Sequence, residues 1–226
     1  MKITDKTLDI FKNFAGINSG MILKKGTKQS TIAPDDAIYV EATLTDDFPS
    51  DFGLYELPKF LTNLSLLESP ELEFGGNVVE MRDKDGLTLT YRGCSPELIH
   101  APSEKAAALK IDNPDVSLAL SVSQIQKLLK VAAVNTFTHL TIFGSNGKLG
   151  VKVSDRASDT SNTGVMELGE WTQNTDFECV FKVEQLKIIP QNYNVTIMKD
   201  SFAIFQNQDN TLKYVIALEI PKKGKR

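Results

Sequence analysis

The feature that most constrains the fold of this 226-residue chain is an internal repeat. A shift of 117 residues superposes residues of similar polarity: Thr4 on Ser121, Leu8 on Ile125, Phe11 on Leu128, Phe14 on Val131, Asn18 on Asn135 and Leu23 on Leu140. A shift of 126 residues places Leu54–Tyr55 and Phe60 over Val180–Phe181 and Leu186. Such a repeat indicates one structural unit used twice. We predict two domains of one fold, residues 1–107 and 108–226, with the linker within 103–114; a chance likeness of two strand-rich halves is the alternative.

The composition indicates a folded protein rather than a disordered one. Hydrophobic residues make up 41% and charged residues 24% of the chain, enough for one large core or two cores of about 110 residues each. No apolar run reaches the ~18 residues of a membrane span, and residues 1–5 lack the hydrophobic core of a signal peptide. Cys94 and Cys179 lie far apart and indicate neither a disulfide framework nor a zinc site. We therefore expect a soluble protein of the reducing cytoplasm, with no membrane contact.

Alternating and β-branched residues predict a strand-rich chain. The clearest strands are expected at 37–44, 86–91, 148–153 and 212–220. Asp85-Gly86 and Asn146-Gly147 predict tight hairpin turns, because these residue types tolerate a positive φ.

Helical spacing of apolar residues occurs at 5–17, 58–67 and 123–134. Thr4 and Ser123 are expected to act as N-caps, and Pro58 suits a first helical turn. Strands interrupted by a few short helices predict an α+β fold.

Each predicted helix places lysine on its solvent face. At 100° per residue, the first helix buries Leu8, Phe11, Phe14 and Ala15, and the last buries Ile125, Leu128, Leu129, Val131 and Ala132. The opposite faces carry Lys6 and Lys12, then Lys59, then Lys127 and Lys130, whereas acidic residues gather in loops and at strand ends. Ordinary solvation explains lysine on any one helix. Three helices with the same pattern favour a basic binding face despite the net charge of −4.

The kind of basic residue limits what such a face binds. Lysine outnumbers arginine 21 to 4. Lysine acts as a point charge towards phosphate, whereas arginine supplies the planar fork that reads guanine. The sequence therefore predicts loose contact with a nucleic-acid backbone and no reading of bases.

No pattern of catalytic or metal-binding residues stands out. His100 and His139 lack the spacing of metal ligands, and we interpret both as structural. Residues 144–150 resemble a phosphate-binding loop only superficially and are read as a hairpin, and residues 83–86 are read as a turn rather than a calcium loop. The acidic cluster of Asp46, Asp47 and Asp51 leaves a metal site open, although a polar loop explains it better. We expect a non-catalytic binding scaffold without metal or cofactor.

These features occur together in a known family. The chain resembles the sliding clamps, or DNA polymerase processivity factors, of the T-even-type tailed bacteriophages. The likeness covers essentially the whole chain and is closest at 12–20 (KNFAGINSG), 126–132 (QKLLKVA), 192–193 (NY) and 214–219 (YVIALE). None of these stretches is a catalytic motif.

The resemblance implies a homotrimeric ring of six similar domains of the DNA-clamp fold, with helices lining the inside and β-sheets outside, around double-stranded DNA. By that implication the residues that face the DNA are Lys6, Lys12, Lys59, Lys127, Lys130 and Lys187, the last in a short second helix of the second half. Subunits would meet by pairing of strands, through Leu87, Leu89 and Tyr91 in one copy and Val165, Met166 and Leu168 in the next.

The resemblance also implies the partners. They are the replicative DNA polymerase, an ATP-dependent clamp loader, and RNA polymerase with late transcription factors, in the cytoplasm of the infected bacterial host. The apolar linker and final strand favour a partner-binding groove formed by Leu109, Ile111, Val215, Ala217 and Leu218. Burial of these residues in the core of the subunit is the alternative.

Two other classes of function stay open at this point. One is a monomeric or dimeric DNA-binding protein that regulates replication through the same lysines. The other is an enzyme with a metal site at Asp46, Asp47 and Asp51. Oligomeric state and binding to circular against linear DNA separate the first from a clamp, and a divalent-metal titration tests the second.

Overall fold

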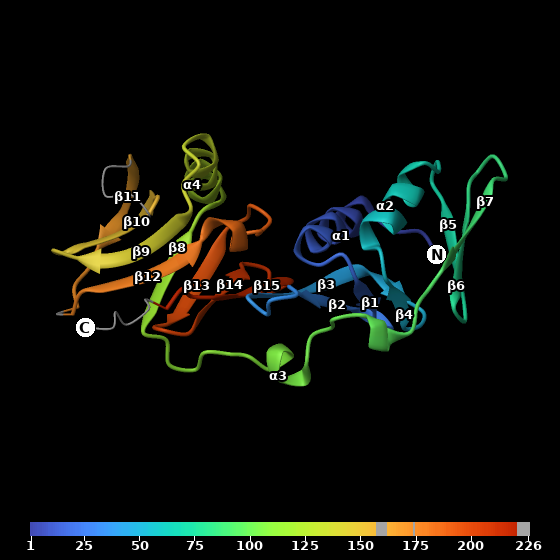
Figure 1. The fold of residues 1–226 in the computed structure, drawn as a ribbon, viewed down its shortest axis with the longest axis horizontal. Helices are drawn as coiled ribbons and strands as arrows, with labels where there is room; N and C mark the ends of the chain where they lie inside the picture. The colour runs from blue at the N-terminus through green and yellow to red at the C-terminus, as the bar shows by residue number, and fades with distance from the viewer. Residues whose placement is uncertain (157–161, 174, 221–226) are drawn as a thin grey trace. The chain divides into compact units, whose positions relative to one another are not determined.

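The chain folds as two units that share one strand. The structure is a computed structural model, and it describes residues 1–156, 162–173 and 175–220 (Figure 1). The first unit comprises Met1–Leu109 with Asp209–Tyr214, and the second comprises Lys110–Gln208 with the chain from Val215 onward. The division after Leu109 lies two residues beyond the expected boundary, and the segment 209–214 returns to the first unit.

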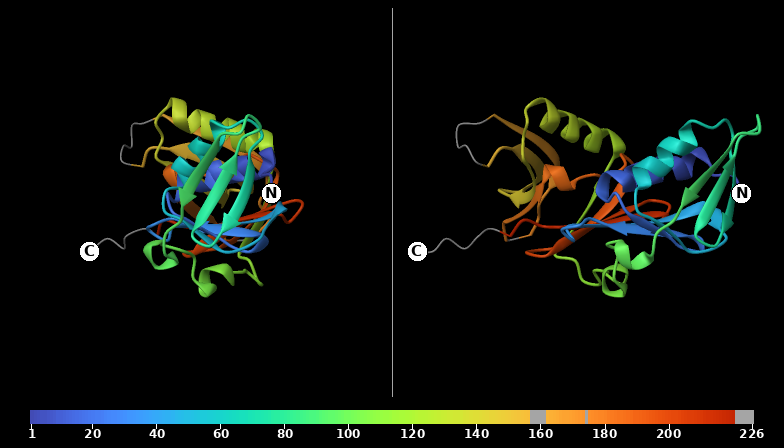
Figure 2. Two further views of the ribbon diagram at one scale, coloured as in Figure 1. Left: turned by 90° about the vertical axis from the view of Figure 1, so that its right-hand side faces the viewer. Right: turned by 45° about the vertical axis from the view of Figure 1, so that its right-hand side comes forward.

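The first unit places two helices beside short sheets. Its elements are α1 (Asp5–Ile17), β1 (Met21–Leu23), β2 (Gly26–Ile32), β3 (Ile38–Phe48), β4 (Phe52–Leu54), α2 (Leu57–Ser65), β5 (Glu71–Gly75), β6 (Val78–Arg82), β7 (Thr88–Arg92), the 3-10 turn η1 (Pro96–Leu98) and α3 (Glu104–Ala107). Strand β1 pairs with β4, and β5, β6 and β7 form a sheet in that order. In another sheet β3 lies between β2 and β15 (Leu212–Ala217), and the first half of β15 belongs to this unit. Helices α1 and α2 lie side by side (Figure 2).

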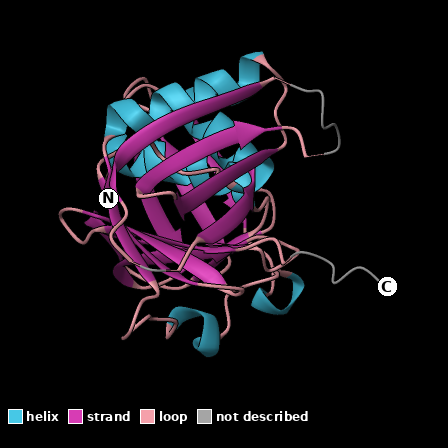
Figure 3. Ribbon diagram, turned by 90° about the vertical axis from the view of Figure 1, so that its left-hand side faces the viewer, coloured by secondary structure: helices cyan, strands magenta, loops and turns pink. Residues whose placement is uncertain are grey.

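The second unit repeats this plan, with the helix α4 beside its strands. Its elements are β8 (Val116–Leu120), α4 (Val122–Val134), β9 (His139–Ser145), β10 (Lys148–Ser154), β11 (Thr163–Glu170), β12 (Phe177–Lys182), the 3-10 turn η2 (Val183–Gln185), β13 (Tyr193–Met198), β14 (Phe202–Asn207) and the second half of β15. One sheet has the order β11-β10-β9-β12, and β8, β13 and β14 are neighbours in another. Helix α4 packs across β10 and β11 (Figure 3).

The 117-residue repeat corresponds to the matching starts of helices α1 and α4. Thr4 and Ser121, which the 117-residue shift superposes, are the N-caps of two 13-residue helices. The prediction that Ser123 caps α4 is wrong by two residues. Ser121 accepts a hydrogen bond from the Gln124 amide, and the Gln124 side chain accepts one from the Ser121 amide, so a capping box fixes the start.

The predicted apolar stripes need correction at their edges. Phe11 and Phe14 are fully buried, but Leu8 and Ala15 are half-buried. Thr7, Ile10 and Ile17 are buried instead, because α1 contacts α2 on one side and β3 on the other.

In α4 the core residues are Ile125, Leu128 and Ala132. Leu129 and Val131 are half-buried at the margins of this stripe. The helical period was therefore correct, but the buried stripe is narrower than predicted.

The remaining predictions of local structure hold with shifted ends. All four strands form, as β3, β7, β10 and β15, and the second helix spans Leu57–Ser65 with Pro58 in its first turn. Asn146 and Gly147 both have positive φ, as a two-residue turn requires, but at Asp85-Gly86 only Gly86 does, within a longer turn. None of the described helices is both long and apolar enough to cross a bilayer. The architecture is α+β, as predicted.

Candidate nucleic-acid interface

Helix α1 is held in place by a carboxylate from a distant strand. Asp46 Oδ2 on β3 accepts hydrogen bonds from the Thr4 amide at 2.8 Å and from Thr4 Oγ1 at 2.9 Å. Thr4 Oγ1 in turn accepts from the Thr7 amide, which caps the helix. No pattern in the sequence indicates this contact, because 42 residues separate its partners. The Asp46–Thr4 contact therefore holds the N-terminal end of α1 against β3.

Of the lysines in the first unit, the three predicted to face DNA lie on exposed helix faces. Lys6 and Lys12 are exposed on α1, and Lys59 is exposed on α2. Lys12 Nζ lies 3.0 Å from Asp9 Oδ1, and Lys59 Nζ lies 3.5 Å from Glu56 Oε2. Each pair joins residues three apart, so both partners share one side of the helix.

Helix α4 presents Lys127 and Lys130, both exposed. Its residues Val122–Val134 include no Asp or Glu. Over the described part of the chain, neither lysine is recorded in an ion pair. The basic side of α4 is thus unlike that of α1 and α2.

Lys187 does not lie on a helix as expected. The predicted second helix of this unit is only the 3-10 turn η2, and Lys187 follows it as an exposed residue between the buried Leu186 and Ile188. The buried side chains of Leu186 and Ile188, rather than a helical period, therefore leave Lys187 exposed.

The strands predicted to join subunits are both at the edges of their sheets. Strand β7 ends the sheet β5-β6-β7, and β11 ends the sheet β11-β10-β9-β12. Leu87 and Val165 are each 60% exposed, whereas Leu89, Met166 and Leu168 are half-buried.

Tyr91 differs from the other predicted interface residues because its side chain is buried. Its ring packs edge-on against Phe60, and its hydroxyl donates to the Glu56 carbonyl at 3.2 Å. Tyr91 therefore braces β7 against α2 within one chain.

The five predicted partner-binding residues separate into two groups. Val215 and Leu218 are buried, at 4% and 8% exposure, and belong to the core as the alternative interpretation held. Leu109, Ile111 and Ala217 are half-buried and keep part of their surface.

The acidic cluster is divided among structural roles. Asp46 accepts two hydrogen bonds from Thr4, the N-cap of α1. Asp51 Oδ1 accepts from the Lys25 amide, and its Oδ2 lies 2.9 Å from Lys24 Nζ. These bonds hold the pKa of Asp51 below its usual value. Among the described residues no group of three or more His, Cys, Asp or Glu side chains is arranged to hold a metal ion.

Both histidines are engaged by neighbouring acids. His100 Nε2 lies 2.8 Å from Asp36 Oδ1, and His139 Nε2 lies 2.7 Å from Glu219 Oε2. These contacts agree with a structural role for each ring.

Cys94 and Cys179 are both free thiols. Burial raises the pKa of Cys179 to about 11 and also raises that of Cys94, which keeps both thiols protonated at neutral pH.

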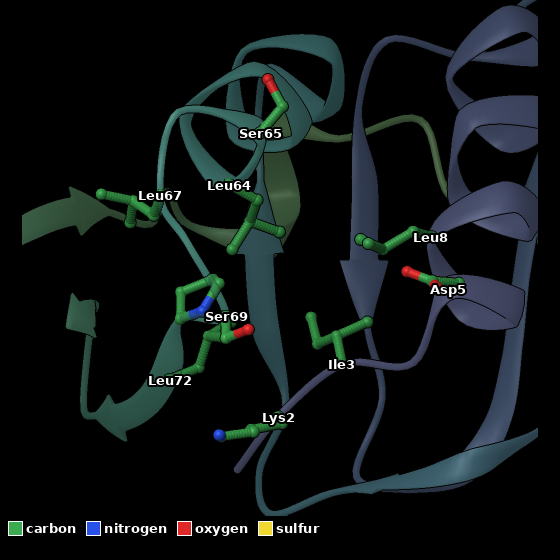
Figure 4. A pocket seen from close by; sticks show the side chains of 10 residues that line it. Lys2, Ile3, Asp5, Leu8, Leu64, Ser65, Leu67, Ser69 and Leu72 are labelled. Carbon is green, nitrogen blue, oxygen red and sulfur yellow. The ribbon is translucent and has the colours of Figure 1, made fainter. Parts of the chain in front are cut away.

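The first unit also contains a pocket that the sequence did not indicate. It has a volume of about 330 Å³ and opens beside the start of α1 and the end of α2 (Figure 4). Leu8, Leu64 and Leu72 form apolar walls, and Lys2 and Asp5 lie at its rim. Elements distant in sequence form it, so residue order alone gives no signal for it.

Two family models match successive parts of the chain. Residues 2–109 match the model described as DNA polymerase processivity factor. Residues 116–220 match the model described as gp45 sliding clamp, C terminal. The two matched ranges correspond closely to the two structural units.

Curated relatives and solved structures agree with these matches. The chain is 29% identical to the sliding clamp of Vibrio phage KVP40, over 97% of this chain and 99% of that protein. It is 28% identical to the sliding clamp of Enterobacteria phage T4, over 97% of each. The fold is that of A. fulgidus PCNA, with a TM-score of 0.70 at 10% identity over 96% of each chain. The chain belongs to the sliding clamps, or DNA polymerase processivity factors, of the T-even-type bacteriophages.

Proposed function

We propose that three copies of this chain close into a ring around double-stranded DNA and tether the replicative DNA polymerase to it. The observation that carries the proposal is that, among the described residues, β7 in the first unit and β11 in the second each form an open edge of their sheet. An exposed strand edge is a template for pairing with another chain. Two different edges on one chain favour head-to-tail contacts, which close into a ring when the rotation permits.

The backbone of β7 supports this role. The amides of Asp83 and Gly93 donate to the carbonyls of Leu87 and Asn77, each at 2.8 Å, and these bonds mark hydrogen-bonded positions of the β6–β7 ladder. Hydrogen-bonded and non-bonded pairs alternate in antiparallel strands. The amides and carbonyls of Thr88, Thr90 and Arg92 therefore point away from β6, where a strand of another copy can pair with them.

The side chains of the two edges are compatible with one continuous sheet. Leu87, directly before β7, and Leu89 within it share the face of the buried Tyr91. In β11, Met166 and Leu168 are half-buried while Val165 and Glu167 are exposed. Pairing that aligns the two apolar faces buries Leu87, Leu89, Met166 and Leu168 between subunits, while Val165 remains on the outer face and contributes mainly backbone.

In this proposal the two clamp domains are residues 1–107 and 108–226, and their helices face the DNA. The contacts come from Lys6, Lys12, Lys59, Lys127, Lys130 and Lys187, all exposed. Lysine–phosphate contacts carry no sequence information and are weakened by salt. Topological closure keeps the protein on DNA, so each contact can stay weak enough for sliding.

The ring itself is non-catalytic in this proposal and acts through its partners. These are the polymerase, an ATP-dependent loader that opens the ring, and RNA polymerase with late transcription factors, in the cytoplasm of the infected bacterial host. For protein partners we retain Leu109, Ile111 and Ala217, which keep some exposed surface. Val215 and Leu218 are buried and offer little surface to a partner.

Solution mass tests the proposed assembly. One chain has a mass of 25.0 kDa, so light scattering over a micromolar concentration series is expected to approach three times that value. A mass that stays at one or two chains over the whole series would contradict the ring. It would favour the alternative of a monomeric or dimeric DNA-binding protein.

A further inference from the structure

The three lysine-bearing helices of the two units differ in net charge. On α1, Lys6 and Lys12 are balanced by Asp5 and Asp9, all four exposed. Asp9 and Lys12 form the 3.0 Å ion pair, with side chains 70% and 65% exposed. The exposed side of α1 is therefore close to neutral.

Helix α2 has the same balance on a smaller scale. Its N-cap residue Glu56 pairs with Lys59, and both side chains are more than half exposed. Asp5 and Glu56 also lie at the N-terminal ends of their helices, where a carboxylate offsets the positive end of the helix dipole.

Helix α4 has neither kind of compensation. Lys127 and Lys130 are exposed, no acidic residue occurs in the helix, and none lies in its first turn. Its cap is the neutral Ser121–Gln124 box. The exposed side of α4 therefore carries two uncompensated positive charges.

We infer that α4 supplies most of the attraction for DNA phosphates, and that Asp9 and Glu56 weaken the share of the first unit. This inference rests on the proposed function. A phosphate near Lys12 or Lys59 also meets a carboxylate within the Debye length of about 8 Å, so attraction and repulsion largely cancel. In a trimer the strong contacts then recur at three positions rather than six.

Matched pairs of neutral substitutions test the inference. The variants are Lys127→Gln with Lys130→Gln, and Lys12→Gln with Lys59→Gln; each removes two positive charges from one chain. The measurement is retention of the loaded clamp on closed circular DNA over a salt series. Loss of a phosphate contact lowers the slope of log binding against log salt by about 0.9. We expect a lower slope and shorter retention from the α4 pair, and a smaller change from the other pair.

A third variant is expected to change retention on DNA in the opposite direction. Asp9→Asn with Glu56→Gln removes the two compensating carboxylates and leaves every lysine in place. We expect longer retention and a steeper salt dependence than in the unsubstituted protein. Urea midpoints of all three variants, compared with that of the unsubstituted protein, show whether folding is unchanged.

The outcomes separate this inference from the proposed function. Equal losses from the two lysine pairs, or no gain from the carboxylate variant, would overturn the inference while leaving the ring intact. An unsubstituted protein that is not retained on closed circles would overturn both.

Discussion

At the scale of single residues, the least expected role belongs to Asp46. The residue is 9% exposed, and its carboxylate accepts two hydrogen bonds from Thr4, at the point where α1 begins. In the sequence it is one of three nearby aspartates in a polar region. Asp46 and its exposed neighbour Asp47 both lie on β3, and only the alternation of buried and exposed positions along that strand distinguishes them.

Asp46→Ala is expected to destabilise the protein by about 1–3 kcal/mol, because the Thr4 amide loses a buried acceptor and the cap loses its anchor. Urea unfolding measures the change. Asp47→Ala is the matched control and is expected to stay within about 0.5 kcal/mol. Equal effects of the two substitutions would show that the Asp46–Thr4 contact contributes nothing to stability.

Cys179 gives a pH-dependent prediction. Burial raises its pKa from 9.0 to about 11, so between these values the unfolded thiol loses its proton while the folded one keeps it. The unfolded state then binds fewer protons, and stability falls as pH rises from 9 to 11, by up to about 2 kcal/mol. Below pH 9 this contribution is fully present. Urea unfolding at several pH values is expected to give a shallower decline for Cys179→Ala; identical declines would contradict a buried, protonated thiol.

At the scale of elements, the cap of α4 is a specific test of why the helix begins where it does. Ser121→Ala is expected to cost about 1 kcal/mol, because the Gln124 amide loses its acceptor. Ser123→Ala changes an exposed serine two residues away and is expected to have little effect. Thermal unfolding of both variants measures the difference. A larger loss from Ser123→Ala would place the cap where the sequence first indicated it.

The edge of β7 allows a substitution that separates folding from assembly. Thr90→Pro removes an amide that points away from β6, and proline is tolerated on edge strands for this reason. We expect the monomer to keep its circular dichroism spectrum and urea midpoint while the trimer is lost. Thr90→Val retains the amide and is expected to assemble normally. A trimeric Thr90→Pro protein would exclude backbone pairing through this edge.

The elements also show where sequence reasoning succeeds and where it ends. The span of α1 was predicted to the residue, because a local cap and a 3.6-residue period fix it. The start of α4 was missed because Ser121 and Ser123 are both good caps, although Gln124 three residues after Ser121 marked the correct one. Tyr91 stays a predicted interface residue, but period-2 alternation identifies only its face and not that Phe60 covers its ring. The strand order, which places β7 and β11 at edges, depends on contacts between distant segments and was reached only through the family resemblance.

At the scale of the whole molecule, the repeat and the charge distribution both favour a ring that encloses DNA. Two units of one plan each contribute a sheet edge and at least one lysine-bearing helix, although the chain as a whole has a net charge of −4. A protein that held DNA by affinity alone would need more positive charge and would lose binding steeply with salt. A closed ring needs little affinity, because the DNA cannot leave sideways.

Retention on DNA of different topology tests this central claim most directly. Labelled protein is loaded with loader and ATP onto a nicked circle, and its dissociation is followed in moderate salt before and after one restriction cut. We predict slow dissociation from the circle and rapid loss within the time needed to slide off once the DNA is linear. Equal lifetimes on circular and linear DNA would contradict topological binding and show that the protein holds DNA by contact alone.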